Sequence, residues 1–371
     1  MTYPSLACNL DHQLLSTALP LLEAGTVSGL EWSYDAVYQY ETLPEWFAAL
    51  LKAFAAEGRL IGHGIFYSVC SGAWSEDQRN YLDRLAHTVE AFPFDHVTEH
   101  FGFLTGANFH RGAPIAPPLT QSTLRIGQDR LHRLHDAARC PVGLENLAFA
   151  YSADDVFRQY AFLDQLVQPI DGLLILDLHN LYCQLHNFSL DLEELLRHIP
   201  LERVREMHLS GGSWDFHHDA PTGRVRRDTH DERVPDEVFH LLHEIAPRCS
   251  NLKFVVLEQL GSALRETEAQ LGFQADFDRM TSVCTAMVQQ PVNDRPAPCL
   301  PNTSPITHPP LQDRALANEQ QELSTILETS STLAEVQDRL SNSSLANSAW
   351  QMENWSPYML ETAWKIARKW R

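Results

Sequence analysis

The sequence has few basic residues for its length. Lys and Arg total 28 against 48 Asp and Glu, so the 371-residue chain carries a formal net charge of −20 at pH 7. A surface of this sign repels nucleic-acid phosphates and anionic lipid headgroups, which argues against either as the main partner. Bound multivalent cations would neutralise part of the excess negative charge.

Long hydrophobic runs and paired cysteines are also missing. No stretch approaches the roughly 20 apolar residues that a transmembrane helix needs, and the opening residues MTYPSLACNLDHQL lack the basic segment and apolar core of a signal peptide. The seven cysteines are scattered, odd in number and form no CxxC pair. We therefore expect reduced thiols in a cytoplasmic protein that has no membrane partner.

Short β-rich runs alternate with longer segments of helical period from the start of the chain to about Val288. The predicted strands are Leu6–Leu10, Gly29–Tyr34, Leu60–Tyr67, His96–Leu104, Val142–Phe149, Leu173–Leu178, Val204–Leu209 and Phe254–Leu257. The helix candidates between them include Pro44–Ala56, Glu76–Ala91, Asp154–Leu166, Leu190–His198 and Pro235–Ile245. Eight such βα pairs predict an α/β protein of the (β/α)8 or TIM-barrel class, with reactive groups at the carboxyl ends of the strands.

Six of these eight strand ends carry side chains of a kind that binds metals. A histidine after a strand, such as His208 in REMHLSGG, is on its own more often a hydrogen-bonding residue than a ligand. The pattern recurs, however, at His63, Glu99, His100, Glu145, Asn146, Asp177, His179, Asn180, His208 and Glu258, and the loop RRDTHD adds Asp228 and His230. Imidazole and carboxylate together suit iron, zinc or manganese, so the sequence predicts a metal site at the barrel mouth.

The carboxyl-terminal quarter has a different composition. We expect domain 1–288 to be the catalytic barrel, residues 289–312 to be a Pro-rich linker, and residues 313–371 to be a helical extension. The last segment interleaves five aromatic residues with four basic ones: Trp350, Trp355, Tyr358, Trp364, Trp370, Lys365, Arg368, Lys369 and Arg371. Such a helix can bind a partner peptide, but it can equally dock back on the barrel.

Several ordered motifs support a more specific interpretation. They are GHG at His63, EHF at His100, LEN at Glu145, LDxxN at Asp177–Asn180, HLSG at His208, DTHD at Asp228–Asp231 and LE at Glu258. In this order and spacing, residues 5 to 285 resemble the multinuclear non-heme iron-dependent oxidases (MNIO), a family first catalogued under the labels DUF692 and UPF0276 as one of unknown function. The resemblance implies a TIM-barrel enzyme that modifies a cysteine or another residue of a ribosomally made precursor peptide.

The resemblance also implies cofactors, partners and site residues. The cofactors would be two or three iron ions, Fe2+ or Fe3+, with dioxygen as co-substrate. The partners would be the precursor peptide and either a small leader-binding protein or the chain's own extension. Asp177 and His208 would be catalytic, and the metal-binding positions would be His63, His100, Glu145, Asp177, Asn180, His208, Asp228, His230 and Glu258.

Two positions depart from the family pattern. His179 stands where the family commonly has Asn, and Leu260 stands where the motif LExD often has Asp. The alternative function is a divalent-metal-dependent hydrolase or isomerase on a xylose-isomerase-like TIM barrel, because such barrels also gather His, Asp and Glu at their strand ends. The motifs HLSG and DTHD favour the oxidase.

Overall fold

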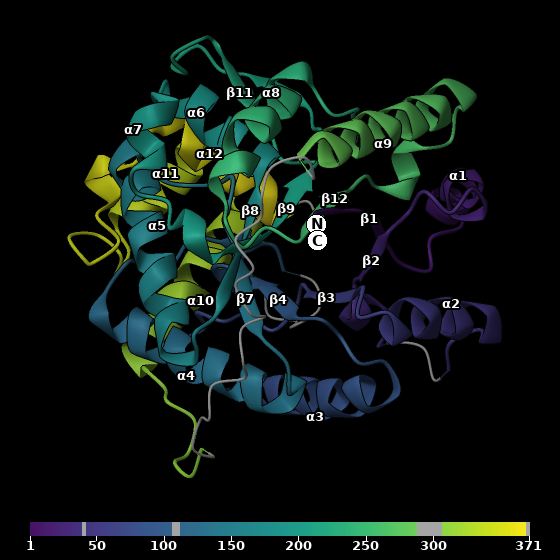
Figure 1. Cartoon of the computed structure of the whole chain (residues 1–371). Helices are drawn as coiled ribbons and strands as arrows, with labels where there is room; N and C mark the ends of the chain where they lie inside the picture. The colour runs from purple at the N-terminus through teal and green to yellow at the C-terminus, as the bar shows by residue number, and fades with distance from the viewer. Residues whose placement is uncertain (39–41, 106–111, 288–305, 369–371) are drawn as a thin grey trace.

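Eight parallel strands close into a barrel whose order is β1-β12-β9-β8-β7-β4-β3-β2. The computed structural model describes residues 1–38, 42–105, 112–287 and 306–368. Figure 1 shows the barrel surrounded by helices. The barrel strands are β1 (Tyr3–Cys8), β2 (Gly29–Trp32), β3 (Leu60–Gly64), β4 (Val97–His100), β7 (Val142–Glu145), β8 (Leu173–Asp177), β9 (Val204–Leu209) and β12 (Phe254–Leu257).

This architecture confirms the predicted (β/α)8 class, although several strands are shorter than predicted at their carboxyl ends. The segment predicted as His96–Leu104 is divided, because Gly102 has φ +122° and turns the chain out of the barrel. The residues beyond the turn form β5 (Phe103–Leu104), which pairs with β6 (Pro114–Ile115) in a separate antiparallel sheet. A second hairpin after β9 consists of β10 (Trp214–Phe216) and β11 (Arg224–Arg226).

The helices that surround the barrel follow the predicted apolar periodicity. The helix α3 begins with a capping box, in which Ser75 and Gln78 each accept a hydrogen bond from the backbone amide of the other. Between the strands lie α1 (His12–Glu23), α2 (Glu45–Ala56), α3 (Glu76–Ala91), α4 (Gln121–Ala138), α5 (Ala153–Val167), α6 (Leu178–Phe188), α7 (Leu192–Leu196), α8 (Asp236–Ile245) and α9 (Thr267–Met287).

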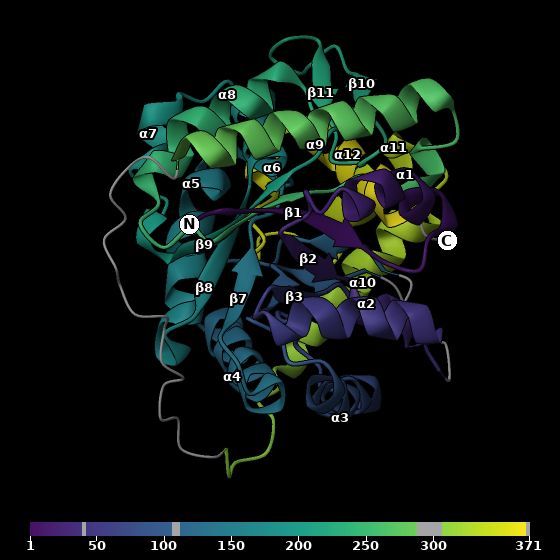
Figure 2. The same ribbon diagram turned by 45° about the vertical axis from the view of Figure 1, so that its right-hand side comes forward.

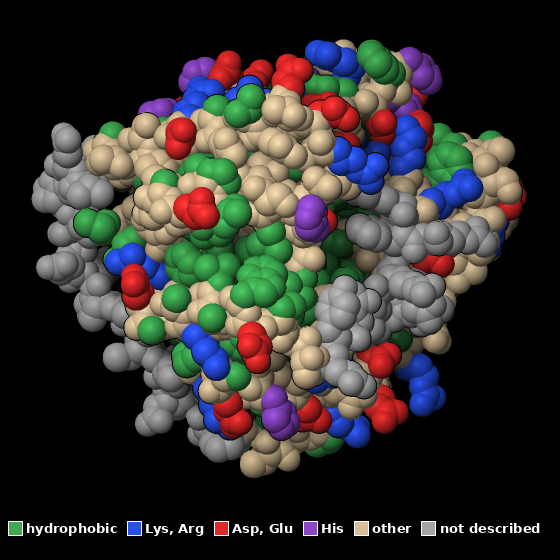
Figure 3. Space-filling model, turned by 90° about the vertical axis from the view of Figure 1, so that its right-hand side faces the viewer, with side chains coloured by type: hydrophobic (Ala, Val, Ile, Leu, Met, Phe, Trp, Pro, Cys, Tyr) green, Lys and Arg blue, Asp and Glu red, His purple; other side chains and the backbone are tan. Residues whose placement is uncertain are grey.

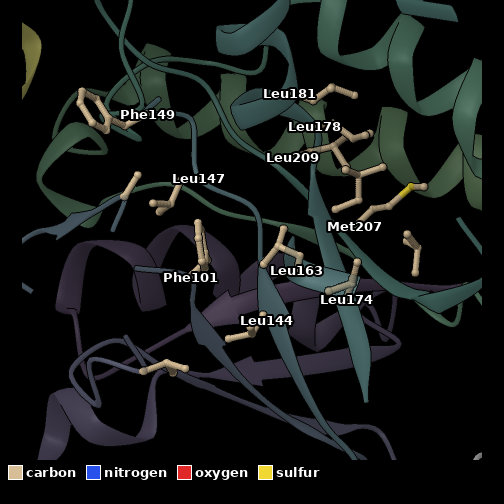
Figure 4. Packing of buried hydrophobic residues seen from close by; sticks show 14 of the residues in the cluster. Phe101, Leu144, Leu147, Phe149, Leu163, Leu174, Leu178, Leu181, Met207 and Leu209 are labelled. Carbon is tan, nitrogen blue, oxygen red and sulfur yellow. The ribbon is translucent and has the colours of Figure 1, made fainter. Parts of the chain in front are cut away.

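The hydrophobic core lies mainly between the strands and the surrounding helices. Figure 4 shows Leu144, Leu174 and Met207 of three barrel strands near Leu163 and Leu181 of the helices, and all of these side chains are buried. The barrel interior, in contrast, contains buried polar side chains, among them Ser5, Glu31, Thr98, Glu206 and His208. The interior also contains a small apolar cluster of Ile61, Phe254 and Val256, so polar groups share it with apolar ones.

The chain ends in three further helices, α10 (Arg314–Thr329), α11 (Leu333–Ser341) and α12 (Pro357–Arg368). Figure 2 shows that they lie beyond the carboxyl ends of the barrel strands. The described part of the predicted linker, residues 306–312, contains no helix or strand, and the rest of that linker lies outside the described residues. The predicted carboxyl-terminal helical extension is confirmed, whereas its independence as a domain stays a prediction.

The described surface carries a few large exposed hydrophobic side chains on neighbouring helices. Leu19 of α1, Trp46 of α2 and Leu271 of α9 are each at least half exposed. Hydrophobic side chains gather on the face to which these helices contribute (Figure 3). Within the described residues, no helix is both long enough and apolar enough to cross a membrane.

Candidate metal centre

His63, His100 and Glu145 form the first group of converging side chains. Strand register places them together, because β4 pairs with β3 on one side and with β7 on the other, where His100 lies opposite Glu145. The Oε2 atom of Glu145 lies 3.3 Å from Nε2 of His63 and 3.3 Å from Nε2 of His100. Three ligand-type atoms therefore face one another at the mouth of the barrel.

Two further groups extend this one across the mouth. Glu145, Asp177 and His208 each offer a ligand atom within 4.8 Å of the others, and so do Asp177, His230 and Glu258. His208 places Nδ1 3.2 Å from Oε2 of Glu258. Because Glu145 and Asp177 each belong to two groups, the three groups form one continuous cluster.

The loop after β9 delivers Asp228 and His230 to this cluster. His230 has φ +54°, a left-handed conformation that costs a non-glycine residue free energy and is often found at functional sites. A side chain on Gly212 would place its Cβ 2.1 Å from the carbonyl oxygen of Arg227. The glycines after His208 thus let the two parts of the loop touch, and Nε2 of His230 lies 2.8 Å from Oδ1 of Asp228.

Asn180, itself one of the predicted ligands, orients two others. Its Nδ2 donates to Oε1 of Glu145 over 3.2 Å, and its backbone amide donates to Oδ1 of Asp177 over 2.5 Å at the start of α6. Asn146 completes this arrangement, because its Oδ1 accepts a hydrogen bond from the backbone amide of Asp177. The two bonds from Asn180 thus hold one oxygen of Glu145 and one oxygen of Asp177, and the second oxygen of each carboxylate faces the cluster.

The two departures from the family pattern both lie at the site. His179 places Nδ1 3.3 Å from Oδ1 of Asp228, and its Nε2 accepts a hydrogen bond from Nε of Arg226 over 3.0 Å. Since Nε2 is the acceptor, the proton sits on Nδ1, and His179 donates to Asp228. Leu260 is 40% exposed and lines the cavity described below.

Glu99 does not converge on the mouth, and its prediction as one of the converging side chains is wrong. Successive side chains of a strand point to opposite faces. Because Thr98 and His100 point into the barrel, Glu99 points outward, where it accepts a hydrogen bond from Tyr81 of α3. Burial raises the pKa of Glu99 well above its usual value.

The sequence reasoning missed a buried polar chain beneath His208. Nε2 of His208 lies 3.0 Å from Oε2 of Glu31 and 3.5 Å from Oε1 of Glu206. Glu206 continues the chain to His96, which contacts Asp95. The signal in the sequence was a charged residue in the middle of an apolar strand, as in GLEW and VREMH.

The electrostatics of the metal-free cluster follow from its burial and its carboxylates. Burial opposes protonation of His63, but the negative charges of Glu31 and Glu145 outweigh it and raise the pKa of His63 to about 10. At His230 the negative charge of Asp228 likewise outweighs burial and raises the pKa of the imidazole to about 10. Burial and the charge of Glu145 raise the pKa of Asp177 well above its usual value. Protons thus compensate part of the charge of the metal-free cluster.

The donor atoms of the cluster fit a bound cation. Four of them are buried and make no hydrogen bond: Oε2 of Glu145, Oδ2 of Asp177, Oδ1 of Asn180 and Nδ1 of His208. Of these, Oε2 of Glu145 and Nδ1 of His208 have only the ion-pair contacts described above. Unpartnered buried polar atoms are uncommon in native proteins, and a bound ion is one recognised reason for them. The set contains nitrogen and oxygen donors and no thiolate, as the sequence analysis expected.

A cavity of about 360 Å³ opens above the cluster. Its floor includes His63, His100, His230 and Glu258. The loops after β7 and β12 form part of its walls, and three side chains of α12 line it as well. The carboxyl-terminal extension therefore contributes to the same cavity as the predicted metal ligands.

Comparisons with known proteins identify the family and the relatives of this chain. The profile of the family described as RiPP precursor modification enzyme MbnB/TglH/ChrH matches residues 32–263. RiPP denotes a ribosomally synthesised and post-translationally modified peptide. A UPF0276 protein of Caulobacter vibrioides is 29% identical over half of this chain, and the match spans 64% of that protein's length. A UPF0276 protein of Shewanella loihica is 26% identical over 56% of this chain and 74% of its own length.

Solved structures with a similar fold include an L-ribulose 3-epimerase, which has a TM-score of 0.49 and 12% identity over 78% of this chain and 96% of its own. A xylose isomerase domain protein from Planctomyces limnophilus has the same TM-score and 13% identity over 78% of this chain and all of its own. The family profile covers more than half of the chain, from Trp32 at the end of β2 to the end of η5 (Gly261–Ala263). The chain belongs to the RiPP precursor modification enzyme family MbnB/TglH/ChrH.

Proposed function

We propose that this protein is an iron- and dioxygen-dependent oxidase that modifies a cysteine of a ribosomally made precursor peptide. Family membership supports the peptide substrate. The observation that carries the metal dependence is the set of buried donor atoms without hydrogen-bond partners in Glu145, Asp177 and His208. Imidazole and carboxylate donors with no thiolate among them suit a non-heme iron site.

The residues that would hold the metals are those that converge on the mouth. Glu145 separates its two oxygens, because Oε2 faces His63 and His100 while Oε1 accepts from Asn180. A carboxylate oxygen that faces two imidazoles in this way would help to hold a cation, and its negative charge would reduce the repulsion between neighbouring cations. When bound, iron would supply redox electrons and open coordination positions for a thiolate and for dioxygen.

The chain's own groups would orient the ligands and shape the surroundings of the reaction. We assign Asp177 and His208 to the centre of the site, because both are completely buried and each contributes to a shared group of donor atoms. Asn180 and Asn146 hold Asp177, and Glu31 holds His208. The apolar side chains of the cavity wall would exclude water around the substrate residue.

The proposal includes the cellular setting and the route of peptide capture. The six described cysteines are buried and unpaired, which supports reduced thiols in the cytoplasm. The precursor peptide would be captured by a small leader-binding protein or by the carboxyl-terminal extension. Asn187, whose carbonyl accepts from Tyr358 of that extension, lines the cavity and links the two parts of the chain.

The test begins with elemental analysis of the full chain purified from iron-supplemented cells. We expect about two or three irons per chain and oxygen consumption when a cysteine-containing precursor peptide is added. His208→Ala and Asp177→Ala should lose metal and abolish oxygen consumption. His243→Ala serves as the matched control, because its side chain is exposed on α8 and belongs to none of the candidate metal-binding groups among the described residues.

Two results would overturn the assignment. Stoichiometric zinc, manganese or magnesium with little iron, together with turnover in the absence of oxygen, would favour a hydrolase or isomerase. Unchanged oxygen consumption in His208→Ala would exclude His208 from the reaction.

A further inference from the structure

Helix α12 places one line of side chains in the cavity. Met359, Thr362 and Ile366 all line it, and their spacing of three and four residues puts them on the same face of the helix. Met359 is 1% exposed and Thr362 is 6% exposed, so these two cavity-lining side chains are almost completely shielded from bulk solvent. This face is therefore part of the site and not a free surface.

The flanks of α12 are attached to the barrel. Glu361 accepts from Nε2 of His217 at 3.0 Å, and Nζ of Lys365 lies 3.2 Å from Asp215. The hydroxyl of Tyr358 donates to the carbonyl of Asn187 over 2.9 Å. These contacts join α12 to the segments around β10 and α6, which also frame the metal cluster.

The opposite side of α12 is attached to the rest of the extension. Nε1 of Trp364 donates to the carbonyl of Ser330 over 3.1 Å, at the end of α10. Just before α12, the ring of Trp355 stacks on Tyr151 with 3.9 Å between centroids. Trp355 and Trp364, two of the aromatic side chains that first suggested a peptide-binding helix, thus fix α12 in place with its cavity-lining face toward the metal cluster. Trp370 lies outside the described residues.

The wall opposite the metal cluster is largely apolar. Leu147 and Phe149, which follow β7, line the cavity together with Leu260 and the two apolar residues of α12. A volume of about 360 Å³ is at the lower end of the roughly 300–1,000 Å³ found for ligand pockets. A cavity of this size and lining accommodates a short extended segment with apolar side chains, and not a folded peptide.

We propose that α12 is the specificity wall of the site, where Met359 and Ile366 contact an apolar side chain adjacent to the modified cysteine. This inference rests on the function proposed above, because it takes the substrate to be a cysteine-containing peptide that binds over the metal cluster. It adds that the chain selects its substrate through its own carboxyl-terminal helix. A peptide with acidic neighbours would lose the apolar contacts and would meet the carboxylates of the floor. Arg226 and Arg227 also line the cavity, but both are already paired with carboxylates of the chain, Glu232 and Asp215.

The test uses the full chain loaded with cobalt, whose absorption spectrum reports ligand binding. Two probes are compared: acetyl-leucyl-cysteinyl-leucinamide and acetyl-aspartyl-cysteinyl-aspartamide. Binding of the probe thiolate produces a sulfur-to-cobalt charge-transfer band that can be titrated. We expect the leucyl probe to bind wild type about 10-fold more tightly than the aspartyl probe, because a hydrophobic pocket discriminates by about this factor.

The variants Met359→Ala and Ile366→Ala should each reduce this preference several-fold and leave the cobalt spectrum without probe unchanged. Ile366→Gln provides a second variant, and because Ile366 is only partly buried we expect the polar side chain to leave the fold intact. Met352→Ala is the matched control, because Met352 belongs to the same extension but does not line the cavity. Melting temperatures of all four variants establish that they are folded.

The outcomes separate this inference from the proposed function. If wild type binds no cobalt, the metal site and the proposed function both fail. If cobalt binds but the two probes bind equally well, the specificity wall is overturned while the metal site stands. An equal loss of preference in Met352→Ala would also overturn it, because the effect would then come from the extension as a whole and not from the cavity face of α12.

Discussion

Replacing Glu31 by alanine should weaken metal binding although Glu31 is not one of the predicted ligands. Its Oε2 lies 3.0 Å from Nε2 of His208, and both side chains are completely buried. The carboxylate accepts a hydrogen bond from the protonated Nε2 of His208. The other ring nitrogen, Nδ1, faces Glu258 and is therefore available to bind metal. Without Glu31 only the more distant Glu206, 3.5 Å away, remains beside Nε2, so the tautomer and the orientation of the imidazole are less well fixed.

The expected magnitude follows from the strength of this bond. A buried hydrogen bond to a charged group contributes about 1.5–3 kcal/mol. Its loss corresponds to a decrease in metal affinity of roughly 10- to 100-fold. Loss of the hydrogen-bond partner of a ligand histidine usually has an effect in the same range. Glu31→Gln keeps an acceptor oxygen and should lie near the lower limit. The assay is a competitive titration of Co2+ against a chromophoric chelator, followed by the cobalt absorption spectrum.

Glu99→Gln is the matched control for this experiment. Glu99 is as deeply buried as Glu31, but it points outward toward Tyr81 and makes no contact with His208. We expect its cobalt affinity to remain within about threefold of wild type, since it does not orient a ligand. Wild-type affinity in Glu31→Ala, or an equal loss in Glu99→Gln, would refute the positioning of His208 by Glu31.

Metal uptake should depend on pH. The carboxylates of the cluster outweigh burial and raise the pKa values of His63 and His230 to about 10, so both imidazoles are protonated at pH 7 and must each release a proton to bind metal. The affinity for metal should therefore rise with pH up to about 10, and a weakly buffered titration should show about two protons released per chain. A metal affinity that does not change with pH would contradict this prediction. Gly212→Ala should lower cobalt affinity at least about 10-fold, because the added Cβ would lie 2.1 Å from the carbonyl oxygen of Arg227 and would displace Asp228. A variant with wild-type cobalt affinity would show that the loop adapts to the added side chain. Removal of metal by a chelator should lower the Tm by about 3–4 °C for each bound ion, relative to protein at 100 times the Kd in free metal. Calorimetry with and without reloaded metal measures this shift.

Local signals in the sequence were sufficient for the main elements of the fold. The strands Val204–Leu209 and Phe254–Leu257 and the helix Glu76–Ala91 have the predicted bounds. These segments are defined by apolar periodicity and by a capping box, which are properties of neighbouring residues. Strand ends were less well predicted, because a loop that turns away from the barrel depends on a single backbone angle, as at Gly102.

The sequence also determined most of the convergence at the barrel mouth, since parallel strands of a closed barrel deliver their carboxyl ends to one place. It did not determine which face of β4 carries Glu99, because that depends on the alternation of side chains relative to the barrel axis. Only the tertiary structure placed Glu31 beside His208 and Met359 above the cluster. These contacts join residues that are distant in the chain, and their geometry is set by barrel closure and by the docking of α12, which no local pattern encodes.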